Sequence, residues 1–411
     1  MGTATDNTGL CNRATTVRAC HVSSVGLNVR AFFRGQFAYL QQHGFRYTVI
    51  ASEPTRRDLW LPDETDYVSV PITRSVTPLR DLRSVWRLYR IFRRGRFDLV
   101  QYTTPKGALL GSVAAFLARV PVRLYLLWGI YYVAQRGWRR RFLKLLDCLT
   151  CRLSTHVTLD GEGIRQFAIT EGLCSPEGSD VIGKGGDNGI DLERFDPDRH
   201  SADAGEIRLR YGIPADAVVI GTVCRLVGDK GINELAAAFD VLAASRPNLW
   251  LLLVGPREER DAPRPDTLRT IEEHPRIVET GEQHDVLGFY AAMDLFCLPT
   301  YREGFSAVTL EAQAMRLPVV TTDTIGAGET IDHGRTGFAV PVGDVERLTE
   351  ALGRLVDDAG LRRDMGQAGR EFVAADFEQQ TFWAAVRKHR EDLVIQSGGF
   401  CHSNAELVRR R

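Results

Sequence analysis

The 411-residue sequence has no long uninterrupted apolar run. A membrane-spanning helix needs about 20 predominantly apolar residues in succession. The most apolar stretch, VPVRLYLLWGIYYVAQ (residues 120–135), is shorter and contains Arg123, which is more typical of a buried strand followed by a loop. The first residues, MGTATDNTGLCNRATT, lack the basic start and apolar core of a secretory signal. We therefore expect a cytoplasmic protein without a spanning helix.

The motifs of several common cofactor sites are also missing. The sequence has no Gly-x-x-x-x-Gly-Lys-Ser/Thr loop, no Gly-x-Gly-x-x-Gly after its first strand and no His-Glu-x-x-His pair. Its eight cysteines are scattered. The one Cys-x-x-Cys, Cys148 and Cys151, has neither a second pair nor a histidine at metal-ligand spacing, which favours two reduced thiols on a helix. We expect no metal and no cofactor.

The sequence also has no net charge, because its 52 Lys and Arg residues balance its 52 Asp and Glu residues. The balance conceals an asymmetry. Residues 1–199 carry 28 Lys and Arg against 19 Asp and Glu, a net charge of +9, and the remaining residues carry −9. A basic half joined to an acidic half indicates different partners for the two halves.

Strand-like and helix-like segments alternate along both halves; the segment NVRAFFRGQFAYLQQHG (residues 28–44), for example, is expected to be one helix that ends at Gly44. Apolar runs such as LWLLLVG (residues 249–255) are typical of strands that are covered on both faces. Such alternation predicts an α/β fold of parallel sheets with helices on both sides. The polar segment DLERFDPDRHSADAGEI (residues 191–207) separates two alternating series. We predict two doubly wound, Rossmann-like domains whose ligand lies beyond the carboxyl ends of the strands, in the cleft between domains. The expected divisions are residues 1–195, residues 205–375, a helix over 376–394 that packs back on the first domain, and a flexible tail over 395–411.

The stretch PTYREGFSAVTLEAQAM (residues 299–315) contains an expected strand-to-helix turn. Gly304, Phe305 and Ser306 fall at or near the start of the helix, where backbone N–H groups lack partners and carry partial positive charge. Such a turn can hold an anion. Glu311 lies inside the helix among apolar residues, so it is either a common surface glutamate or a carboxylate that pairs with the adjacent hydroxyls of a ribose.

A second strand-to-helix loop, GTVCRLVGDKGI (residues 221–232), carries Arg225 and Lys230. An arginine offers a planar fork to paired oxygens and a lysine offers a compact charge. Together with a helix N-terminus, these two cations suit a diphosphate. If the loop is considered by itself, the alternative is that Arg225 and Lys230 are two solvated surface cations.

These segments resemble the retaining nucleotide-sugar glycosyltransferases of the glycogen-synthase-like family, which have the GT-B fold. The matching pieces of the second half are GTVCRLVGDKGINEL, LLLVGP, YAAMDLFCLPTYREGFSAVTLEAQAMRLPVVTTD and DHGRTGFAVPVGD. The first half is similar to the subgroup that builds bacterial surface polysaccharides, in ITRSVTPLRDLRSVWRLYRIFRR, TTPKGALLGSVAAFLARVPVRLY and GKGGDNGIDLERFDP. The resemblance covers about Val17 to Val386. It implies transfer of a hexose or N-acetylhexosamine from a nucleotide sugar, by subgroup a UDP-sugar, to a lipid-linked or polysaccharide acceptor held by the first domain.

The resemblance also implies roles for individual residues. Arg225 and Lys230 match the pair that holds the donor diphosphate, and Glu303 matches the acidic residue that contacts the donor sugar. Those three are the expected catalytic residues. The expected donor-binding residues are the backbone cradle and the ribose carboxylate, with two positions in the first half of the chain: Gly304, Phe305, Ser306, Glu311, Gly26 and Asn188.

Two positions depart from the family pattern. Relatives often carry a His-Gly where this sequence has Trp128 and Gly129, and those of the subgroup often have His where it has Tyr102. Both changes fall in the acceptor half. They leave open a non-catalytic protein that binds sugar nucleotides. A sugar-nucleotide epimerase of the same architecture is the other alternative, although it needs catalytic carboxylates and a histidine that we cannot place.

Two basic segments of the first half are interleaved with aromatic residues. The first, residues 73–96, carries arginines at positions 74, 80, 83, 87, 90, 93, 94 and 96 around Trp86, and the second, residues 136–144, carries Arg136, Arg139, Arg140, Arg141 and Lys144 around Trp138 and Phe142. Basic helices with aromatics suit an anionic membrane surface. We expect a peripheral protein on the inner face of the plasma membrane, with no nucleic-acid partner; nucleic acid and a plain solvated face are the competing readings.

Overall fold

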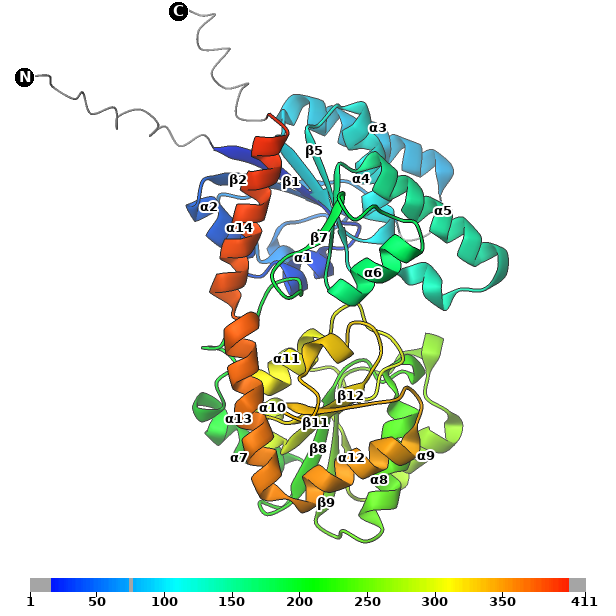
Figure 1. The fold of residues 1–411 in the computed structure, drawn as a ribbon, viewed down its shortest axis with the longest axis vertical. Coiled ribbons are helices and arrows are strands. Elements are labelled where there is room, and N and C mark those ends of the chain that lie inside the picture. Colours follow the sequence, from blue (N-terminus) through cyan, green and yellow to red (C-terminus); the bar gives the residue numbers. More distant parts are fainter. Residues whose placement is uncertain (1–15, 74–76, 399–411) are drawn as a thin grey trace, which may run out of the picture. The chain divides into compact units, whose positions relative to one another are not determined.

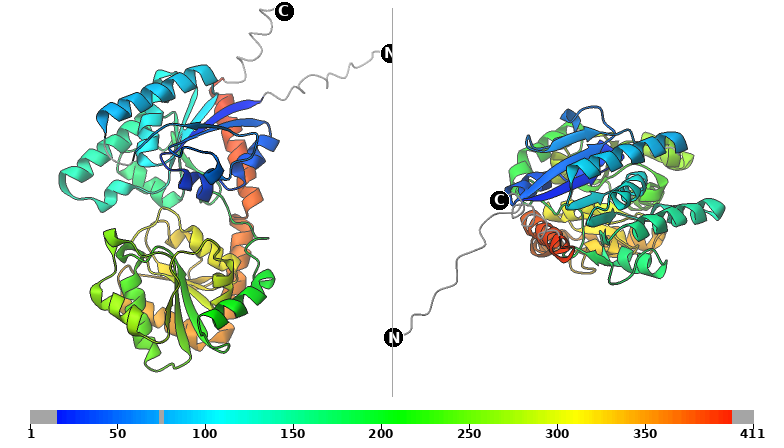
Figure 2. Two further views of the ribbon diagram at one scale, coloured as in Figure 1. Left: turned by 180° about the vertical axis from the view of Figure 1, so that it is seen from behind. Right: turned by 90° about the horizontal axis from the view of Figure 1, so that it is seen from above.

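The computed structural model describes residues 16–73 and 77–398. Arg74 of the first basic segment, the first fifteen residues and residues 399–411 of the expected tail lie outside the described residues. The predicted fold class is confirmed, because two parallel sheets carry helices on both faces (Figures 1 and 2). No helix within the described ranges combines the length and apolar character needed to span a bilayer.

The first sheet has seven strands in the order β3-β2-β1-β4-β5-β6-β7. Strand β1 pairs in parallel with both β2 and β4, so the strand order reverses between β1 and β4. The strands are β1 (Val17–Val22), β2 (Phe45–Ala51), β3 (Asp66–Ser69), β4 (Leu99–Tyr102), β5 (Val122–Leu127), β6 (His156–Leu159) and β7 (Ser179–Val181). The helices between them are α1 (Gly26–Phe32), α2 (Gln36–Gln42), α3 (Pro78–Gly95), α4 (Pro105–Leu117), α5 (Gly137–Leu153) and α6 (Glu162–Thr170).

The second sheet has six strands in the order β10-β9-β8-β11-β12-β13, and its order reverses between β8 and β11. The strands are β8 (Val218–Val223), β9 (Leu249–Val254), β10 (Ile277–Glu279), β11 (Leu295–Leu298), β12 (Val319–Thr322) and β13 (Gly337–Val340). The helices of this part are α7 (Ser201–Arg210), α8 (Ile232–Ala243), α9 (Pro265–Glu273), α10 (Leu287–Ala292), α11 (Ala307–Ala314), α12 (Val345–Asp357), α13 (Ala359–Asp376) and α14 (Gln379–Gln396).

By its internal contacts the chain divides into two units. Of the described residues, the first unit contains those within 16–126, 141–157 and 386–398, and the second contains residues 127–140 and 158–385. Within the first unit, Arg390 of α14 is buried and donates from Nε to Oε1 of Gln101 on β4 over 3.2 Å. The C-terminal part of α14 is thereby held to the first sheet.

Apolar strands build the two cores as expected. Strand β9 is buried along nearly its whole length, and Leu251 and Leu253 pack on one face of the second sheet while Leu252 and Val254 pack on the other. Helix α3 begins at Pro78, the first helical position that suits proline, and buries Ser84, Leu88 and Phe92. This single buried face leaves the arginines of α3 on the remainder of its surface.

Two details differ from the predicted elements. The segment NVRAFFRGQFAYLQQHG, expected to be one helix, forms α1 and α2 because Gly35 has a φ of 78° and interrupts the helix. Strands β3, β6, β7 and β10 were not predicted. Each has three or four residues with at least one polar or charged side chain among them, in DYVS, HVTL, SDV and IVE, so none stands out as an apolar run.

Candidate active site

The predicted diphosphate loop (residues 221–232) and the turn expected to contact the donor sugar (residues 303–306, the sugar turn) follow two neighbouring strands of the second sheet. Strands β8 and β11 pair in parallel, with Ile220 opposite Leu295, so the loops that leave their carboxyl ends emerge side by side. The order of the sheet reverses between these two strands. A doubly wound sheet offers its ligand crevice at such a point.

Lys230 and Glu303 are brought together by these loops. The Lys230 ammonium forms an ion pair with Oε1 of Glu303, and the two side chains are only 16% and 15% exposed. The loops are also joined through their backbones, since the Asp229 carbonyl accepts hydrogen bonds from the Tyr301 amide over 2.9 Å and the Thr300 hydroxyl over 3.2 Å. Two predicted catalytic residues therefore lie in direct contact.

Gly231 makes this approach of the two loops possible. It has a φ of 73°, in the left-handed region that glycine adopts readily. A Cβ atom at this position would lie 2.0 Å from the carbonyl oxygen of Pro299. Only glycine allows the loop with Lys230 to lie this close to the end of β11.

Arg225 lies in the same loop but is more exposed than Lys230. Its guanidinium donates to Oε2 of Glu258 over 2.6 Å, and both side chains are about half exposed. An ion pair in such an exposed position contributes little to stability. An incoming phosphate can therefore compete with Glu258 for Arg225 at small cost.

The turn before α11 presents the backbone cradle that the sequence predicts. Ser306 is the N-cap residue of α11, and its side chain makes no capping hydrogen bond. Within the part of the chain that the structure describes, the amides of Gly304, Phe305 and Ser306 donate no hydrogen bond. The Ser306 hydroxyl is buried and also without a partner there. This group of donors at a helix N-terminus suits an anion or a sugar hydroxyl.

Glu311 lies further along α11, where it accepts a hydrogen bond from the Tyr290 hydroxyl over 2.9 Å. Burial raises the pKa of Glu311 to about 7, although the Tyr290 hydrogen bond and the charge of Arg194 oppose the shift. A carboxyl group placed in this way is costly to ionise until further donors reach it. Glu311 is partly buried, and its role in ribose binding stays a prediction.

The remaining two predicted donor-binding residues have other contacts. Asn188 is buried, and its Oδ1 accepts a hydrogen bond from Nε1 of Trp383 on α14 over 2.9 Å. Gly26 begins α1 in the first unit, where its amide donates to Oε1 of Glu53 over 2.5 Å. A role in donor binding stays a prediction for both residues.

Sequence reasoning missed two acidic residues of the second unit: Asp160, which is buried, and Asp187, which is partly buried. Asp160 follows β6, and its Oδ2 would lie 2.5 Å from a Cβ atom placed on Gly304. Burial, followed by the charge of Asp187, raises the pKa of Asp160 well above its ordinary value. Burial also raises the pKa of Asp187 to about 7, with a contribution from Glu311. An acidic residue at the carboxyl end of an apolar strand was the available signal for Asp160.

The two positions that depart from the family pattern lie in different surroundings. Gly129, which follows Trp128, lies next to the sugar turn, because a Cβ atom on it would be 3.6 Å from the Cα of Gly304. Tyr102 is fully buried in the first unit and forms a 2.5 Å hydrogen bond with Ser154. Tyr102 is thus a core residue of β4.

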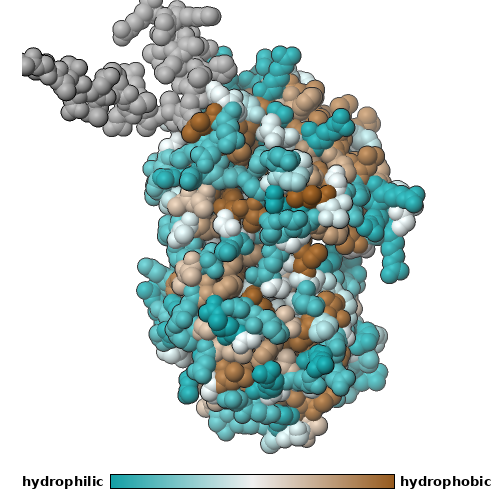
Figure 3. Space-filling view, in the orientation of Figure 1, coloured by the Kyte–Doolittle hydropathy of each residue, from teal (hydrophilic) through white to brown (hydrophobic). Residues whose placement is uncertain are grey.

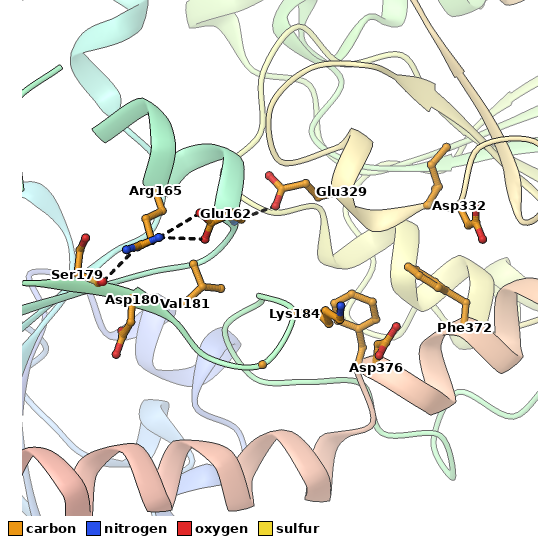
Figure 4. A pocket seen from close by; sticks show the side chains of 13 residues that line it. Glu162, Arg165, Ser179, Asp180, Val181, Lys184, Glu329, Asp332, Phe372 and Asp376 are labelled. Carbon is orange, nitrogen blue, oxygen red and sulfur yellow. Dashed lines mark hydrogen bonds and ion pairs between the residues drawn. The ribbon is translucent and has the colours of Figure 1, made fainter. Parts of the chain in front are cut away.

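A separate cavity of about 690 Å³ in the second unit lies outside this group of residues. Figure 4 shows Arg165 between Glu162 and Ser179 on one side of the cavity, and Lys184, Phe372 and Asp376 also line it. The cavity contains none of the predicted donor-binding residues, and its charged lining is mainly acidic: Glu162, Asp180, Glu329, Asp332 and Asp376 against Arg165 and Lys184. This lining does not favour a diphosphate.

Comparisons with known proteins show which family and which fold the chain resembles. Residues 203–372 match the family model "Glycosyl transferases group 1", and residues 29–183 match "Glycosyl transferase 4-like domain". The chain is 29% identical over 379 residues, 92% of its length and 98% of the relative, to the capsular polysaccharide biosynthesis glycosyltransferase CapM of Staphylococcus aureus. It is 25% identical, over 84% of its length and 89% of the relative, to the UDP-Gal:alpha-D-GlcNAc-diphosphoundecaprenol alpha-1,3-galactosyltransferase of Escherichia coli. Its fold matches HepE of Anabaena, solved in complex with UDP-glucose, with a TM-score of 0.74 at 20% identity over 91% of this chain and 99% of that one.

Proposed function

Because the chain belongs to the group 1 glycosyltransferases, which have the GT-B fold, we propose that it transfers a hexose or N-acetylhexosamine from a UDP-sugar to a lipid-linked or polysaccharide acceptor in cell-surface glycan synthesis. The observation that carries the proposal is the meeting of Lys230 and Glu303 beside three unpaired backbone amides. This arrangement places a cation, anion-binding N–H groups and a hydroxyl-binding carboxylate together. A nucleotide diphosphate sugar needs each of these groups.

The parts of such a donor can be assigned along the loops. Lys230 and Arg225 hold the diphosphate together with the amides of Gly304 and Phe305. Glu303 binds hydroxyl groups of the transferred sugar. Glu311 accepts hydrogen bonds from the ribose, which adds donors to the one that the Tyr290 hydroxyl already supplies. The names of two relatives, an E. coli enzyme that uses UDP-Gal and a HepE complex with UDP-glucose, support uridine as the base.

We infer that transfer retains the anomeric configuration by attack from the face that the diphosphate leaves. The acceptor hydroxyl forms the new bond to the anomeric carbon as the bond to the diphosphate oxygen breaks, and a phosphate oxygen takes the hydroxyl proton. Negative charge then grows on the diphosphate. Lys230 and Arg225 lie where they can stabilise that charge, and contacts that strengthen as the bond breaks lower the barrier.

A donor-panel assay tests the proposal and separates its rivals. The purified protein is incubated with UDP-, GDP- and ADP-sugars and a bacterial membrane lipid extract, and products are identified by mass spectrometry. We expect one sugar to appear on a lipid or polysaccharide acceptor. Isomerised free donor would identify an epimerase instead, and donor binding without any product would identify a non-catalytic sugar-nucleotide protein.

We further propose that α3 and α5 contact an anionic membrane surface where a lipid-linked acceptor is presented. Each helix exposes an apolar stripe at helical spacing among its arginines: Leu79, Leu82 and Trp86 on α3, and Trp138, Phe142, Leu145 and Leu149 on α5. Figure 3 shows hydrophobic residues among hydrophilic ones in the upper right part of the surface, where Figure 1 places α4 and α5. Apolar residues flanked by cations favour binding at an anionic lipid surface.

A further inference from the structure

Asp160 has the properties of a binding group that lacks its ligand in the free protein. It is 4% exposed, and its Oδ1 is buried with no hydrogen-bond partner among the described residues. A buried carboxylate without a partner on one oxygen carries a free-energy cost. Such a group calls for an explanation, and a ligand hydroxyl that donates to it is the simplest one.

The position of Asp160 indicates which ligand that is. Its Oδ2 lies beside Gly304, the glycine of the sugar turn, and the backbone of Gly129 lies on the same side of that glycine. The Asp160 carbonyl accepts a hydrogen bond from the Gly186 amide over 2.7 Å, which fixes the backbone that carries this side chain. Asp160 therefore faces the turn that carries Glu303, although it belongs to a different segment of the chain.

We propose that Asp160 is a further donor-sugar-binding residue, whose buried carboxyl group accepts a hydrogen bond from a hydroxyl group of the transferred sugar beside Gly304. This inference rests on the proposed function, because it assumes a nucleotide sugar at the Lys230–Glu303 pair. It adds a second acidic contact on the sugar at a point where the family pattern predicted none. Together, Asp160 and Glu303 select a sugar with free hydroxyl groups on the side that faces the turn.

The test compares the wild type with Asp160→Ser, and titration calorimetry measures the dissociation constants for UDP and for UDP-glucose, UDP-galactose and their N-acetyl counterparts. The sugar contribution is the ratio of the dissociation constant for UDP to that for the preferred donor. We expect Asp160→Ser to reduce this ratio about tenfold, which corresponds to the loss of one buried hydrogen bond worth about 1.4 kcal/mol. The affinity for UDP alone is expected to change less than twofold. Asp147, a buried carboxyl group on α5 in the first unit, supplies the matched control Asp147→Ser, which should leave the ratio unchanged.

Monodeoxy analogues of the preferred donor provide a second test. If Asp160 had only a structural role, its replacement would not change the ratio of affinities for the parent donor and a deoxy analogue. The wild type is expected to bind one deoxy analogue about tenfold more weakly than the parent donor, and Asp160→Ser should bind both equally. The conservative variant Asp160→Asn, which keeps an acceptor oxygen, should recover part of the discrimination. Thermal unfolding checks the fold of each variant, and removal of the buried carboxyl group should not lower Tm.

The outcomes separate this inference from the proposed function. If the wild type prefers a UDP-sugar over UDP and Asp160→Ser keeps the same ratio, the assignment of Asp160 is overturned while the proposed function stands. If Asp160→Ser loses UDP affinity and Tm together with the ratio, Asp160 supports the fold and does not bind sugar. If the wild type binds no nucleotide sugar, the proposed function is wrong and the assignment of Asp160 is wrong with it.

Discussion

The ion pair between Lys230 and Glu303 keeps both side chains in place before any donor arrives. Each is mostly buried, so neither samples many other rotamers and little side-chain entropy remains to be lost on binding. Under the proposed function, donor binding would separate the pair, because the diphosphate would attract the lysine while sugar hydroxyls would bind the glutamate.

Replacement of Lys230 by alanine is expected to lower kcat about 100- to 1,000-fold. Removal of one donor from a site that stabilises developing negative charge commonly costs about 2.7–4 kcal/mol. The affinity for UDP should fall as well, because the diphosphate loses a cation. Steady-state kinetics and calorimetry measure the two effects.

Lys106 offers a matched control for that variant. It forms a 2.7 Å ion pair with Asp81 in the first unit, with side-chain exposures of 15% and 18% that resemble those of Lys230 and Glu303. Both alanine variants should lose similar unfolding free energy, but Lys106→Ala should keep its UDP affinity. Equal losses of UDP affinity in the two variants would contradict the assignment of Lys230.

Donor affinity is expected to rise with pH through neutrality because of Glu311. Its pKa of about 7 lies above the ordinary 4.5, and ribose hydroxyls donate to the ionised form. Binding therefore releases a proton, and the affinity at pH 6 should be about tenfold below its limit at high pH. A UDP-sugar is the suitable ligand, since the terminal phosphate of UDP itself titrates near pH 6. Glu311→Gln should flatten the profile, and an unchanged slope in this variant would assign the titration to another group, such as Asp187.

Glu311 should also make the unfolding free energy fall as pH rises, which is opposite to its effect on donor affinity. A carboxyl group whose pKa is raised on folding stabilises the protein fully below its unfolded pKa of about 4.5, and this contribution is lost as pH rises through about 7. Urea unfolding at pH 5 and at pH 8 measures this decline in unfolding free energy. The decline should be smaller in Glu311→Gln than in the wild type.

Sequence reasoning at this scale identified residues that carry a recognisable pattern. Lys230, Glu303 and Glu311 stand in motifs, so the sequence predicts one site for them, and the structure brings Lys230 and Glu303 into contact. The direct contact of Lys230 with Glu303 could not be predicted from the sequence, because it depends on the pairing of β8 with β11. Asp160 was missed for the same reason, since Gly304, which it faces, is distant in sequence and only folding brings the two together.

At the scale of elements, the site depends on strand-to-helix turns that need particular backbone conformations. Long apolar strands such as β9 and long helices such as α3 could be predicted from their periodicity and helix-terminal residues. The break between α1 and α2 was missed because a glycine inside a helical pattern is usually tolerated. Gly35 interrupts the helix through its positive φ, a property that the pattern does not reveal.

Gly231→Ala is expected to affect stability and donor binding together. The new methyl group would meet the Pro299 carbonyl at 2.0 Å and force apart the loops that carry Lys230 and Glu303. Gly212→Ala is the matched control, because Gly212 has a φ of 68° but no atom near its Cβ position. The control should lose about 1 kcal/mol of unfolding free energy from backbone strain alone. Gly231→Ala should lose more than the control and should also weaken UDP binding; equal losses in denaturant unfolding would show that the loops do not touch.

At the scale of the whole molecule, the first half is basic and the second half is acidic, and we propose a different partner for each half. The second half is acidic overall, yet it places Lys230 and Arg225 where a diphosphate is expected. The first half concentrates its arginines on α3 and α5, beside exposed apolar stripes. Composition alone predicted the asymmetry, but the stripes became visible only once the buried face of each helix was known.

Binding to anionic liposomes is the expected consequence of those helices. The protein should float with vesicles that contain phosphatidylglycerol at low salt, and less so with purely zwitterionic vesicles or at high salt. A double variant, Leu82→Ser with Trp86→Ser, should reduce flotation. Leu209→Ser, which changes an 83% exposed leucine on α7 of the second unit, should not. Flotation that is equal in both variants, or absent at low salt, would contradict a membrane-facing role for α3.

A crystal structure of the protein with the donor that the panel assay selects tests the central claim most directly. We predict the diphosphate within hydrogen-bond distance of Lys230, Arg225 and the amides of Gly304 and Phe305, the ribose on Glu311, and the sugar on Glu303 and Asp160. A nucleotide sugar bound away from the Lys230–Glu303 pair, or a ribose that does not reach Glu311, would contradict the account.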